Sequence, residues 1–436
     1  MKYYHWCRRV IAGVVAIVMS VSMASAVAGG KYGGGYAAPD WAGSWAAAPS
    51  APGPFDAPIS ALDDQTIRQV VRLSAGGRSL RVHWSNLQGT GPLTIGGVTV
   101  ARHLGDGEIA AHSLRTVTFN GAESVVIAPG ASVVSDPVRL RTRPLAELAI
   151  SAYFPAGASL PGSPVTTHVR ALQTAYVGDG DQTDADELVV DSTLTSWLWL
   201  EGVDVATRRS LPVIAMLGDS ITNGDESTPD ANNRFPDQVA ERLFRWRGQR
   251  GAGILNLGIS GNQVTNTLIG ANAQARLDRD VLAQSGVTHM VLLEGINDLG
   301  LPPLLGVPAA TSDAIISGLA QMATRARTAG LTVIGGTITP SGGFVLPTYG
   351  SPETEAARQA VNAWIRSTDA FDAVVDFDAV LADPDNPNLM RSDLTADGLH
   401  PNDAGYDAMA RALVRVLNGK GRRAYADDDD DDEDDD

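Results

Sequence analysis

The spacing of hydrophobic residues divides the chain into two parts. From Trp41 to about Val205, short segments alternate apolar and polar residues, are rich in β-branched side chains, and are separated by turn signals such as Asn120-Gly121. Such alternation is typical of antiparallel strands with one buried face. Residues 41–205 are therefore predicted to form an all-β sandwich domain, jelly-roll-like and without helices. Strands are predicted in residues 66–74, 79–87, 93–103, 114–121, 124–130, 137–143 and 145–155.

After residue 209 the pattern changes to uniform apolar runs of strand length that alternate with amphipathic segments of helical period. Strands buried on both faces have continuous apolar runs, and their alternation with helices implies right-handed βαβ units around a parallel sheet. Residues 209–418 are thus predicted to form a second domain, of the α/β class. Its predicted strands are 213–217, 251–258, 288–295, 331–338 and 372–377. Its predicted helices are 235–248, 312–330, 354–367 and 404–418.

The beginning of the chain carries an export signal. Basic residues precede an apolar run that ends in Ala24-Ser25-Ala26, which is typical of a secretory signal peptide over residues 1–26, cleaved after Ala26. A membrane anchor is the alternative, but the run is short for a bilayer span. We therefore expect a secreted, extracellular protein without stable membrane insertion after cleavage. Residues 27–40 are rich in glycine and predict a linker.

Charge and cysteine content exclude several classes of protein. The formal net charge is -17, and ten of the negative charges lie in residues 427–436, which predict a disordered acidic tail. That tail is expected to act as a solvating appendage, with weak capture of calcium or of a basic surface as the alternative. The remaining chain is only mildly acidic, so no nucleic-acid partner is expected. Cys7 is the only cysteine, and the four histidines of residues 41–205 lack companions at ligand spacing, so no disulfide, metal site or cofactor is expected.

Polar motifs follow three of the predicted strands and precede the last predicted helix. A lone Gly-Asp-Ser triplet is weak evidence, because all three residue types are common in turns. Ligands of parallel sheets bind beyond the carboxyl ends of the strands, so these motifs are expected to lie close together. In chain order they are Gly218-Asp219-Ser220, then Gly261 and Asn262, then Asn297, and finally Asp397 and His400.

These residue types match what a serine needs to hydrolyse an ester. Ser220 is the predicted nucleophile, His400 its general base, and Asp397 the carboxylate that orients the base. The backbone amides of Ser220 and Gly261 and the side-chain amide of Asn297 are the predicted donors to the tetrahedral oxyanion. The proposed chemistry needs no metal.

Four spaced blocks resemble those of the GDSL-type or SGNH hydrolases. In order they are Gly218-Asp219-Ser220, the glycine of "GISGN", Gly295-Ile296-Asn297-Asp298 and Asp397-Gly398-Leu399-His400-Pro401. The resemblance covers about residues 209–418 and implies a three-layer α/β/α SGNH-hydrolase domain with a parallel sheet. It implies a serine nucleophile, a glycine and an asparagine in the oxyanion hole, and an Asp-x-x-His pair that completes the triad. Ile221 stands where the family usually has leucine, and Asn223 where relatives often carry aspartate.

The preceding half, from "WAGSWAAAPS" to "WLWLEGVDV", is similar to the β-rich module ahead of the catalytic domain in large secreted bacterial members, some acetylxylan-esterase-like and some lipase-like. Asn223, Arg234 and Asn262 lie beside the motifs and are candidate substrate contacts. Trp197 and Trp199 are expected to pack between the domains. The alternative is a sugar-stacking platform formed by Trp41, Trp45, Trp84, Trp197 and Trp199.

Taken together, these patterns predict a secreted serine carboxylic ester hydrolase that works through an acyl-enzyme intermediate. Its expected partner is an acylated carbohydrate or another small ester, with a short-chain acyl group such as the O-acetyl group of a polysaccharide. A lipase-like or lysophospholipase-like acylhydrolase is one alternative. A non-catalytic secreted glycan-binding protein is the other.

Overall fold

The computed structural model describes residues 40–53, 56, 58–207, 210–246, 251–419 and 423–424. By their contacts these residues fall in a single unit. The predicted signal peptide (1–26), the linker (27–40, apart from the backbone of Asp40) and the acidic tail (427–436) lie outside the described residues. We call residues 40–207 the β-rich half and residues 210–424 the α/β half. The predicted domain boundaries at 205 and 209 stay a prediction.

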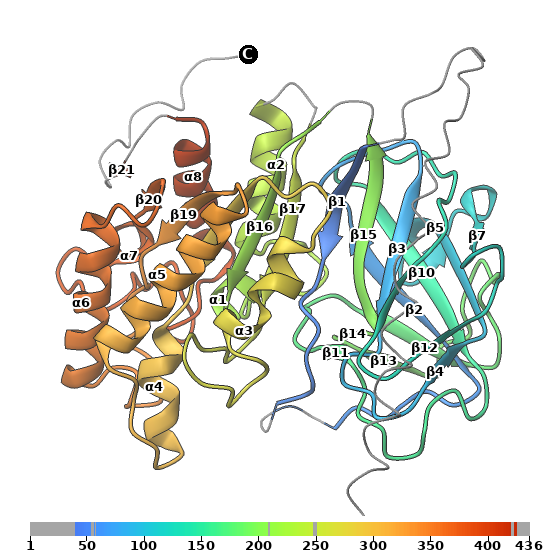
Figure 1. Ribbon diagram of the computed structural model, residues 1–436, viewed down its shortest axis with the longest axis horizontal. Coiled ribbons are helices and arrows are strands. Elements are labelled where there is room, and N and C mark those ends of the chain that lie inside the picture. The colour runs from blue at the N-terminus through green and yellow to red at the C-terminus, as the bar shows by residue number, and fades with distance from the viewer. Residues whose placement is uncertain are drawn as a thin grey trace, which may run out of the picture. The chain divides into compact units, whose positions relative to one another are not determined.

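The described residues of the β-rich half form strands and one short 3₁₀ turn, η1 (Ala111–Ser113). The strands are β1 (Asp40–Ala46), β2 (Gln65–Arg72), β3 (Leu80–Ser85), β4 (Leu93–Ile95), β5 (Gly97–Gly105), β6 (Glu108–Ile109), β7 (Arg115–Val117), β8 (Val125–Ile127), β9 (Ser132–Val134), β10 (Glu147–Phe154), β11 (Thr167–His168), β12 (Ala175–Asp179), β13 (Ser192–Leu194), β14 (Trp197–Leu198) and β15 (Leu200–Thr207). They make two main antiparallel sheets, in the orders β1-β15-β3-β9 and β13-β12-β2-β10-β5-β6, with β7 beside β5 (Figure 1). Val82 and Val203 of the first sheet and Ile67 and Ile150 of the second share one core.

A β-rich region ahead of an α/β region is therefore confirmed, but one predicted strand is absent. Residues 137–143 make only an isolated bridge, between Val138 and Leu80. Their side chains still alternate between buried and exposed, with Val138 and Leu140 buried. The alternating sequence pattern therefore indicates a buried face here, but not a continuous ladder of strand hydrogen bonds. Pro137 and Pro144 flank the segment, and proline has no N–H to donate to a ladder. The jelly-roll-like connectivity stays a prediction.

The two tryptophans of "TSWLWLEG" are buried. Trp197 donates its indole N–H to the carbonyl of Val70 at 3.0 Å and packs edge-on against Trp45, with 4.8 Å between ring centroids. Trp197 also meets the α/β half, because the guanidinium of Arg234 lies 5.6 Å from its ring. Trp199 packs on Phe154 inside the β-rich half. Both rings thus fill core volume, and only Trp197 packs between the halves.

Six parallel strands form the sheet of the α/β half, in the order β17-β16-β18-β19-β20-β21. They are β16 (Val213–Gly218), β17 (Gly253–Gly258), β18 (His289–Leu293), β19 (Thr332–Gly336), β20 (Ala373–Val375) and β21 (Arg423–Ala424). The helices are α1 (Ser220–Asn223), α2 (Phe235–Trp246), α3 (Ala273–Leu277), the π-type turn η2 (Asp278–Leu282), α4 (Ile296–Leu304), α5 (Ser312–Thr328), α6 (Pro352–Ser367), α7 (Phe377–Leu381) and α8 (Asp403–Leu417). Each predicted strand and helix of this half has a counterpart. Helix α4 was not predicted, because Pro302 and Pro303 lie inside it.

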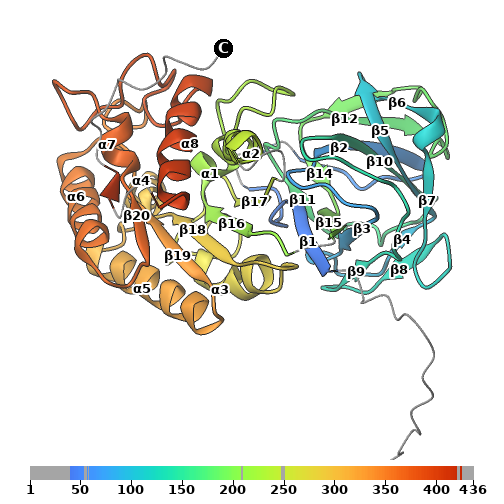
Figure 2. The same ribbon diagram turned by 90° about the horizontal axis from the view of Figure 1, so that it is seen from above.

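Helices pack on both faces of the parallel sheet. Val213, Ala215 and Leu217 of β16 belong to a core shared with α3, α5 and α6. Ile214 and Met216, whose side chains point the other way, belong to a core shared with α2, α7 and α8. Figure 2 shows α3 and α5 on one side of the strands and α2 and α8 on the other. Strands covered on both faces explain why the sequence has uniform apolar runs here.

Strand β1 contributes to the cores of both halves. Ala42 and Ala46 are buried in the core of the α/β half, whereas Trp45 is buried in the core of the β-rich half. The backbone N–H of Gly43 donates to the carbonyl of Ser285 at 2.8 Å. Because side chains alternate along a strand, a single strand supplies apolar surface to two cores.

Arg276 joins the carboxyl ends of the first two strands of the α/β half. Its side chain has no exposed surface. It donates to the carbonyls of Gly218 and Leu257, at 2.8 and 2.7 Å, and to Asn262 Oδ1 at 2.9 Å. It also pairs with the buried carboxylate of Asp280 at 3.1 Å. One cation therefore holds two strand ends and the loop that follows β17.

We expect Arg276→Ala to lower the free energy of unfolding by about 3–5 kcal/mol, because it leaves the buried oxygens of Gly218, Leu257 and Asn262 without this donor. Asp280 then keeps only its pair with Arg279. Urea denaturation measures this difference. Arg245→Ala is the control, because Arg245 is 77% exposed and pairs only with Glu241 on the same helix among the described residues. That change should cost less than about 0.5 kcal/mol. Equal effects of the two substitutions would contradict the role given to Arg276.

Candidate active site

Ser220 begins the one-turn helix α1 directly after β16. Asp219 caps this helix, because its Oδ1 accepts a hydrogen bond from the backbone N–H of Ile221 at 3.0 Å. Gly218 allows the helix to approach closely, since a Cβ there would lie 2.1 Å from Thr222 Oγ1. The Gly-Asp-Ser sequence thus makes a sharp strand-to-helix turn that places Ser220 at the carboxyl edge of the sheet.

His400 and Asp397, from the loop before α8, meet Ser220 at this edge. His400 Nε2 lies 2.9 Å from Ser220 Oγ, and His400 Nδ1 lies 2.6 Å from Asp397 Oδ2. The backbone N–H groups of Leu399 and His400 donate to the other carboxylate oxygen, at 2.9 and 2.8 Å. The carboxylate on Nδ1 assigns the ring proton to that nitrogen, so Nε2 presents its lone pair to the serine hydroxyl.

Burial and charge set the pKa values of this pair. Burial alone would raise the pKa of Asp397, but hydrogen bonds from the His400 side chain and two backbone N–H groups, with the charge of His400, hold it at about 2. Burial alone would lower the pKa of His400. The hydrogen bond to Asp397 and the negative charges of Asp225 and Asp397 outweigh burial, so the pKa of His400 is raised. Asp397 is therefore ionised at neutral pH.

Asn297 and Gly261 line the same cavity as Ser220. Tyr349 donates its hydroxyl to Asn297 Oδ1 at 2.7 Å. Asn297 Nδ2 is buried and has no hydrogen-bond partner among the described residues, so it is a donor available to a ligand oxygen. Gly261 has φ +80°, a backbone conformation that favours glycine at this point of the wall.

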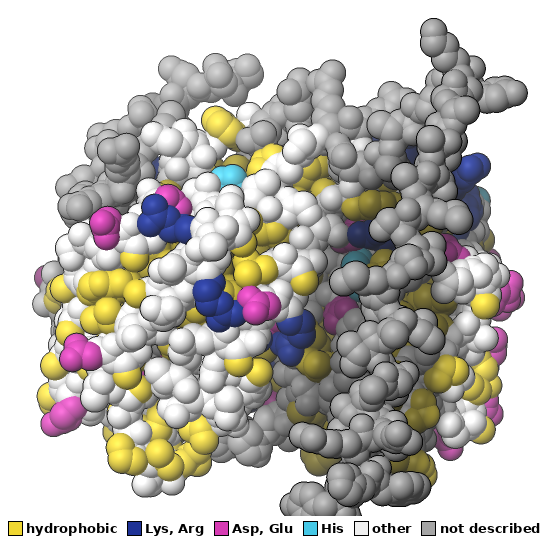
Figure 3. Space-filling model, viewed as in Figure 1, with side chains coloured by type: hydrophobic (Ala, Val, Ile, Leu, Met, Phe, Trp, Pro, Cys, Tyr) yellow, Lys and Arg dark blue, Asp and Glu magenta, His cyan; other side chains and the backbone are white. Residues whose placement is uncertain are grey.

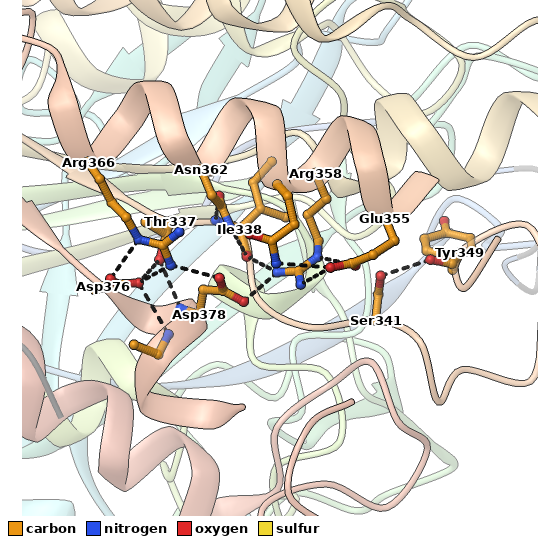
Figure 4. Close-up of polar contacts among 12 residues, drawn as sticks. Thr337, Ile338, Ser341, Tyr349, Glu355, Arg358, Asn362, Arg366, Asp376 and Asp378 are labelled. Atoms are coloured by element: carbon orange, nitrogen blue, oxygen red, sulfur yellow. Dashed lines mark hydrogen bonds and ion pairs between the residues drawn. The ribbon is translucent and has the colours of Figure 1, made fainter. Parts of the chain in front are cut away.

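Polar contacts behind the site hold Tyr349 in place (Figure 4). Ser341 Oγ donates to the carbonyl of Tyr349 at 2.9 Å. Asn362 of α6 bonds both the N–H and the carbonyl of Ile338, at 2.7 and 2.8 Å. Arg358, fully buried on the same helix, donates to that carbonyl and pairs with one carboxylate of α6 and one of α7. The segment that carries Tyr349 is thereby fixed to α6.

The cavity around Ser220 has a volume of about 490 Å³. Its apolar residues come mainly from α4 and from the segment before α6, and they include Leu301, Leu304, Leu305, Phe344 and Leu346. Leu304 and Leu305 are partly exposed, as is Val307 beyond them, and Figure 3 shows apolar side chains gathered over the α4 end of the molecule. The polar residues that line the cavity include Asp56, Arg170, Asp225 and Ser260. The cavity thus offers both an apolar and a polar lining.

The structure places the three candidate substrate contacts away from this lining. Asn223 is buried and donates to the Arg170 carbonyl, Asp225 and Ser260. Arg234 pairs with Asp237 at 2.5 Å, and Asn262 donates to the carbonyl of Ile269 at 2.9 Å. These contacts give the three residues structural partners within the protein. Each lies close in sequence to a cavity residue, but its side chain points into the fold.

Asp298, next to Asn297 in the third block, supports the loop that follows Gly261. Its carboxylate accepts hydrogen bonds from Val264 N at 2.7 Å and from Thr265 N and Oγ1 at 2.9 and 2.6 Å. It therefore fixes the glycine loop against α4, and no contact of Asp298 reaches Ser220 or His400.

Two groups of cavity residues were not identified in the sequence analysis. Arg170 and Tyr349 stand in segments without a recognisable motif. The apolar residues of α4 follow directly after the Gly-Ile-Asn-Asp block, in "LGLPPLLG", and an apolar run beside a catalytic motif was the available signal.

Among the described residues no group of three or more His, Cys, Asp or Glu side chains is placed to hold a metal ion. No helix in the described part of the chain is long and apolar enough to cross a membrane.

Comparisons with known proteins found solved structures that are similar to about half of this chain. Solved structures similar to this chain include a GDSL-like lipase from Bacteroides thetaiotaomicron, with a TM-score of 0.37 and 20% identity over 49% of this chain and 91% of its own. They also include a variant of an acetyl xylan esterase from Geobacillus stearothermophilus (0.36; 21% identity; 48% and 97% covered). A third is a putative arylesterase from Agrobacterium tumefaciens (0.35; 18% identity; 48% and 99% covered).

None of the curated proteins compared with the chain matches it. Residues 216–408, which carry Ser220, Gly261, Asn297, Asp397 and His400, match the model of the GDSL-like lipase/acylhydrolase family. The comparisons thus find a GDSL-like lipase/acylhydrolase domain in residues 216–408.

Proposed function

We propose that the protein is a serine carboxylic ester hydrolase in which Ser220, His400 and Asp397 act as the catalytic triad. The observation that carries the proposal is the hydrogen-bonded chain from Ser220 Oγ through His400 to Asp397, at 2.9 and 2.6 Å. A serine, an imidazole and an ionised carboxylate coupled in this way are what acyl transfer requires. The same hydrogen-bonded arrangement of Ser220, His400 and Asp397 argues against the alternative of a glycan-binding protein without catalytic activity. Helices on both faces of the sheet support the three-layer α/β/α class.

Acylation of the enzyme is the first half-reaction. Ser220 Oγ attacks the ester carbonyl carbon while its proton moves to His400 Nε2. The carbonyl oxygen becomes an oxyanion, which the backbone N–H groups of Ser220 and Gly261 and the side-chain amide of Asn297 stabilise. The bond to the alkoxy oxygen then breaks, and the leaving alcohol takes the proton from His400. Asp397 stays ionised and holds the imidazole in one orientation.

Hydrolysis of the acyl-enzyme is the second half-reaction. A water molecule gives a proton to His400 Nε2 while its oxygen attacks the acyl carbon. The same three donors stabilise the second oxyanion. The bond to Ser220 Oγ breaks, Ser220 regains the proton from His400, and the carboxylic acid leaves. The sequence of steps consumes one ester and one water and yields one alcohol and one acid.

For the substrate we propose short-chain acyl esters, with the O-acetyl groups of a polysaccharide as the natural target, reached after export through the predicted signal peptide. The mixed apolar and polar lining of the cavity supports an ester with an apolar acyl group and a polar alcohol. A second candidate is an acylhydrolase for longer chains. Leu301, Leu304, Leu305, Phe344 and Leu346 favour it, because they present more apolar surface than an acetyl group covers.

The first test compares 4-nitrophenyl esters of increasing acyl length. We expect acetate and butyrate to be hydrolysed, and butyrate to be at least as good a substrate, because each buried methylene contributes about 0.8 kcal/mol. Ser220→Ala, folded as judged by circular dichroism, should lack this activity and form no acyl-enzyme. A maximum of kcat/KM at dodecanoate would favour the second candidate. Full activity of Ser220→Ala would overturn the proposal.

The second test concerns Asn297 and Tyr349. Asn297→Ala should lower kcat by roughly 10²–10³ with little change in KM, because it removes one oxyanion donor. Tyr349→Phe should lower kcat by about tenfold, since the hydroxyl holds the amide in the orientation that presents Nδ2. In the Asn297→Ala background the same change should have no further effect. Tyr153→Phe, which removes a hydroxyl bound to Asp64 in the β-rich half, is the control. Equal losses in both backgrounds would show that Tyr349 does not act through Asn297.

The third test is the pH dependence of kcat/KM. His400 accepts a proton only when neutral, so activity should rise with pH through the pKa of His400. That pKa is raised, so the midpoint should lie above the ordinary histidine value of about 6.5. Asp397→Asn should move the midpoint to lower pH, since the carboxylate raises the pKa, and should lower kcat by about 10⁴. A midpoint below the ordinary value would contradict the electrostatics described here.

A further inference from the structure

The β-rich half forms part of the wall of the cavity that contains the catalytic serine. Arg170, between β11 and β12, lines this cavity together with Asp225 and His400. The Arg170 side chain is 47% exposed, and its Nη1 lies 3.3 Å from Asp225 Oδ2. The α/β half alone therefore does not complete the cavity. The role of the β-rich half follows from what this wall can bind.

The segment that carries Arg170 is bonded to the loop that follows the catalytic serine. His168 Nε2 lies 2.7 Å from Asn223 Oδ1, and Asn223 Nδ2 donates to the carbonyl of Arg170 at 3.0 Å. Further hydrogen bonds join residues 171–174 to residues 230–234. The two segments come from different halves, and the bonds between them fix Arg170 relative to the nucleophile.

The backbone of Arg170 is in an unusual conformation. Its φ is +55°, in the left-handed region that residues with a Cβ rarely adopt. Such conformations persist where the surroundings over-determine them, and they concentrate at functional sites. Here the hydrogen bond from Asn223 to the Arg170 carbonyl holds the backbone. The guanidinium is thus presented to the cavity from a fixed point.

The charges around Arg170 favour a neutral ligand rich in hydroxyl groups. The guanidinium is already paired with Asp225 at 3.3 Å and with Asp56 at 3.1 Å, so two carboxylates surround one cation and a further anion would be repelled. Ser260 Oγ donates to Asp225 Oδ1 at 2.7 Å and orients that carboxylate. Hydroxyl groups both donate to carboxylates and accept from guanidinium N–H groups. Neighbouring hydroxyls of a sugar or polyol match this arrangement.

We propose that Arg170 and Asp225 form an alcohol subsite, and that this subsite binds the hydroxyl groups of a neutral sugar or polyol in the ester. The inference rests on the proposed function, because it names the alcohol part of the same substrate. The apolar lining from α4 takes the acyl group, and the β-rich half supplies the recognition of the leaving alcohol. The β-rich half is then a specificity element of the active site.

The test compares acetate esters that differ only in their alcohol. The substrates are 4-nitrophenyl acetate, a monoacetylated methyl xyloside and a phosphate-bearing acetylated sugar. In Arg170→Gln we expect kcat/KM for the xyloside ester to fall by about tenfold to hundredfold, mainly through KM. 4-Nitrophenyl acetate, which has no hydroxyl group, should lose much less. Arg115→Gln, at an exposed arginine of β7 whose side chain contacts only nearby carbonyls among the described residues, should change neither rate.

Each outcome of this comparison is decisive. Equal losses on the xyloside ester and on 4-nitrophenyl acetate would overturn the subsite, because Arg170 would then support catalysis in general. A wild-type preference for the phosphate-bearing sugar that Arg170→Gln abolishes would show an anion site and would also overturn it. If the wild-type protein hydrolyses none of the three esters, the proposed function fails, and this result is distinct from failure of the subsite.

Product inhibition tests the same subsite in the wild-type protein, independently of how Arg170→Gln folds. Free methyl xyloside should inhibit hydrolysis of 4-nitrophenyl acetate competitively, because it occupies the alcohol subsite. The deacetylated form of the phosphate-bearing sugar should inhibit more weakly, because Asp225 and Asp56 repel its phosphate group. Stronger inhibition by the phosphate-bearing sugar, or no inhibition by the xyloside, would contradict the proposal.

Discussion

The position of β16 between β17 and β18 decides where the functional side chains of the α/β half meet. The chain passes from β16 to β17 on one side of it and then from β17 to β18 on its other side, and in parallel sheets a crevice opens where the strand order reverses in this way. Ser220, Gly261 and Asn297 follow the carboxyl ends of these three adjacent strands. Arg276 holds two of the strand ends together from within the fold. The positions of these side chains therefore depend first on the order of the strands in the sheet.

The hydrogen bond between His400 and Ser220 joins residues 180 positions apart, so it forms only when the sheet is complete. The α/β half also contains buried carboxyl groups. Burial raises the pKa of Asp219 to about 7 and that of Glu294 well above its usual range. Asp397, ionised by its hydrogen bonds, keeps its charge on the far side of the imidazole.

The β-rich half is packed into this arrangement and is not a separate appendage. Strand β1 buries alanines in the core of the α/β half and Trp45 in its own core. The segment around Arg170 is bonded to Asn223, the last residue of α1. A substitution in the β-rich half can therefore alter the position of Ser220 in two ways, through the apolar packing of β1 or through the hydrogen bonds around Asn223.

The sequence by itself determined the features that depend on neighbours along the chain. Alternating and uniform apolar runs gave the two kinds of sheet, and the spacing of Asp397 and His400 put a carboxylate within reach of an imidazole in one turn. Only the tertiary structure decided that Asn223, Arg234 and Asn262 bond within the protein, while Tyr349 and Arg170 line the cavity. The physical reason is that a buried polar side chain takes its hydrogen-bond partners from whichever segments fold beside it, and proximity in sequence to a motif does not fix which way that side chain points.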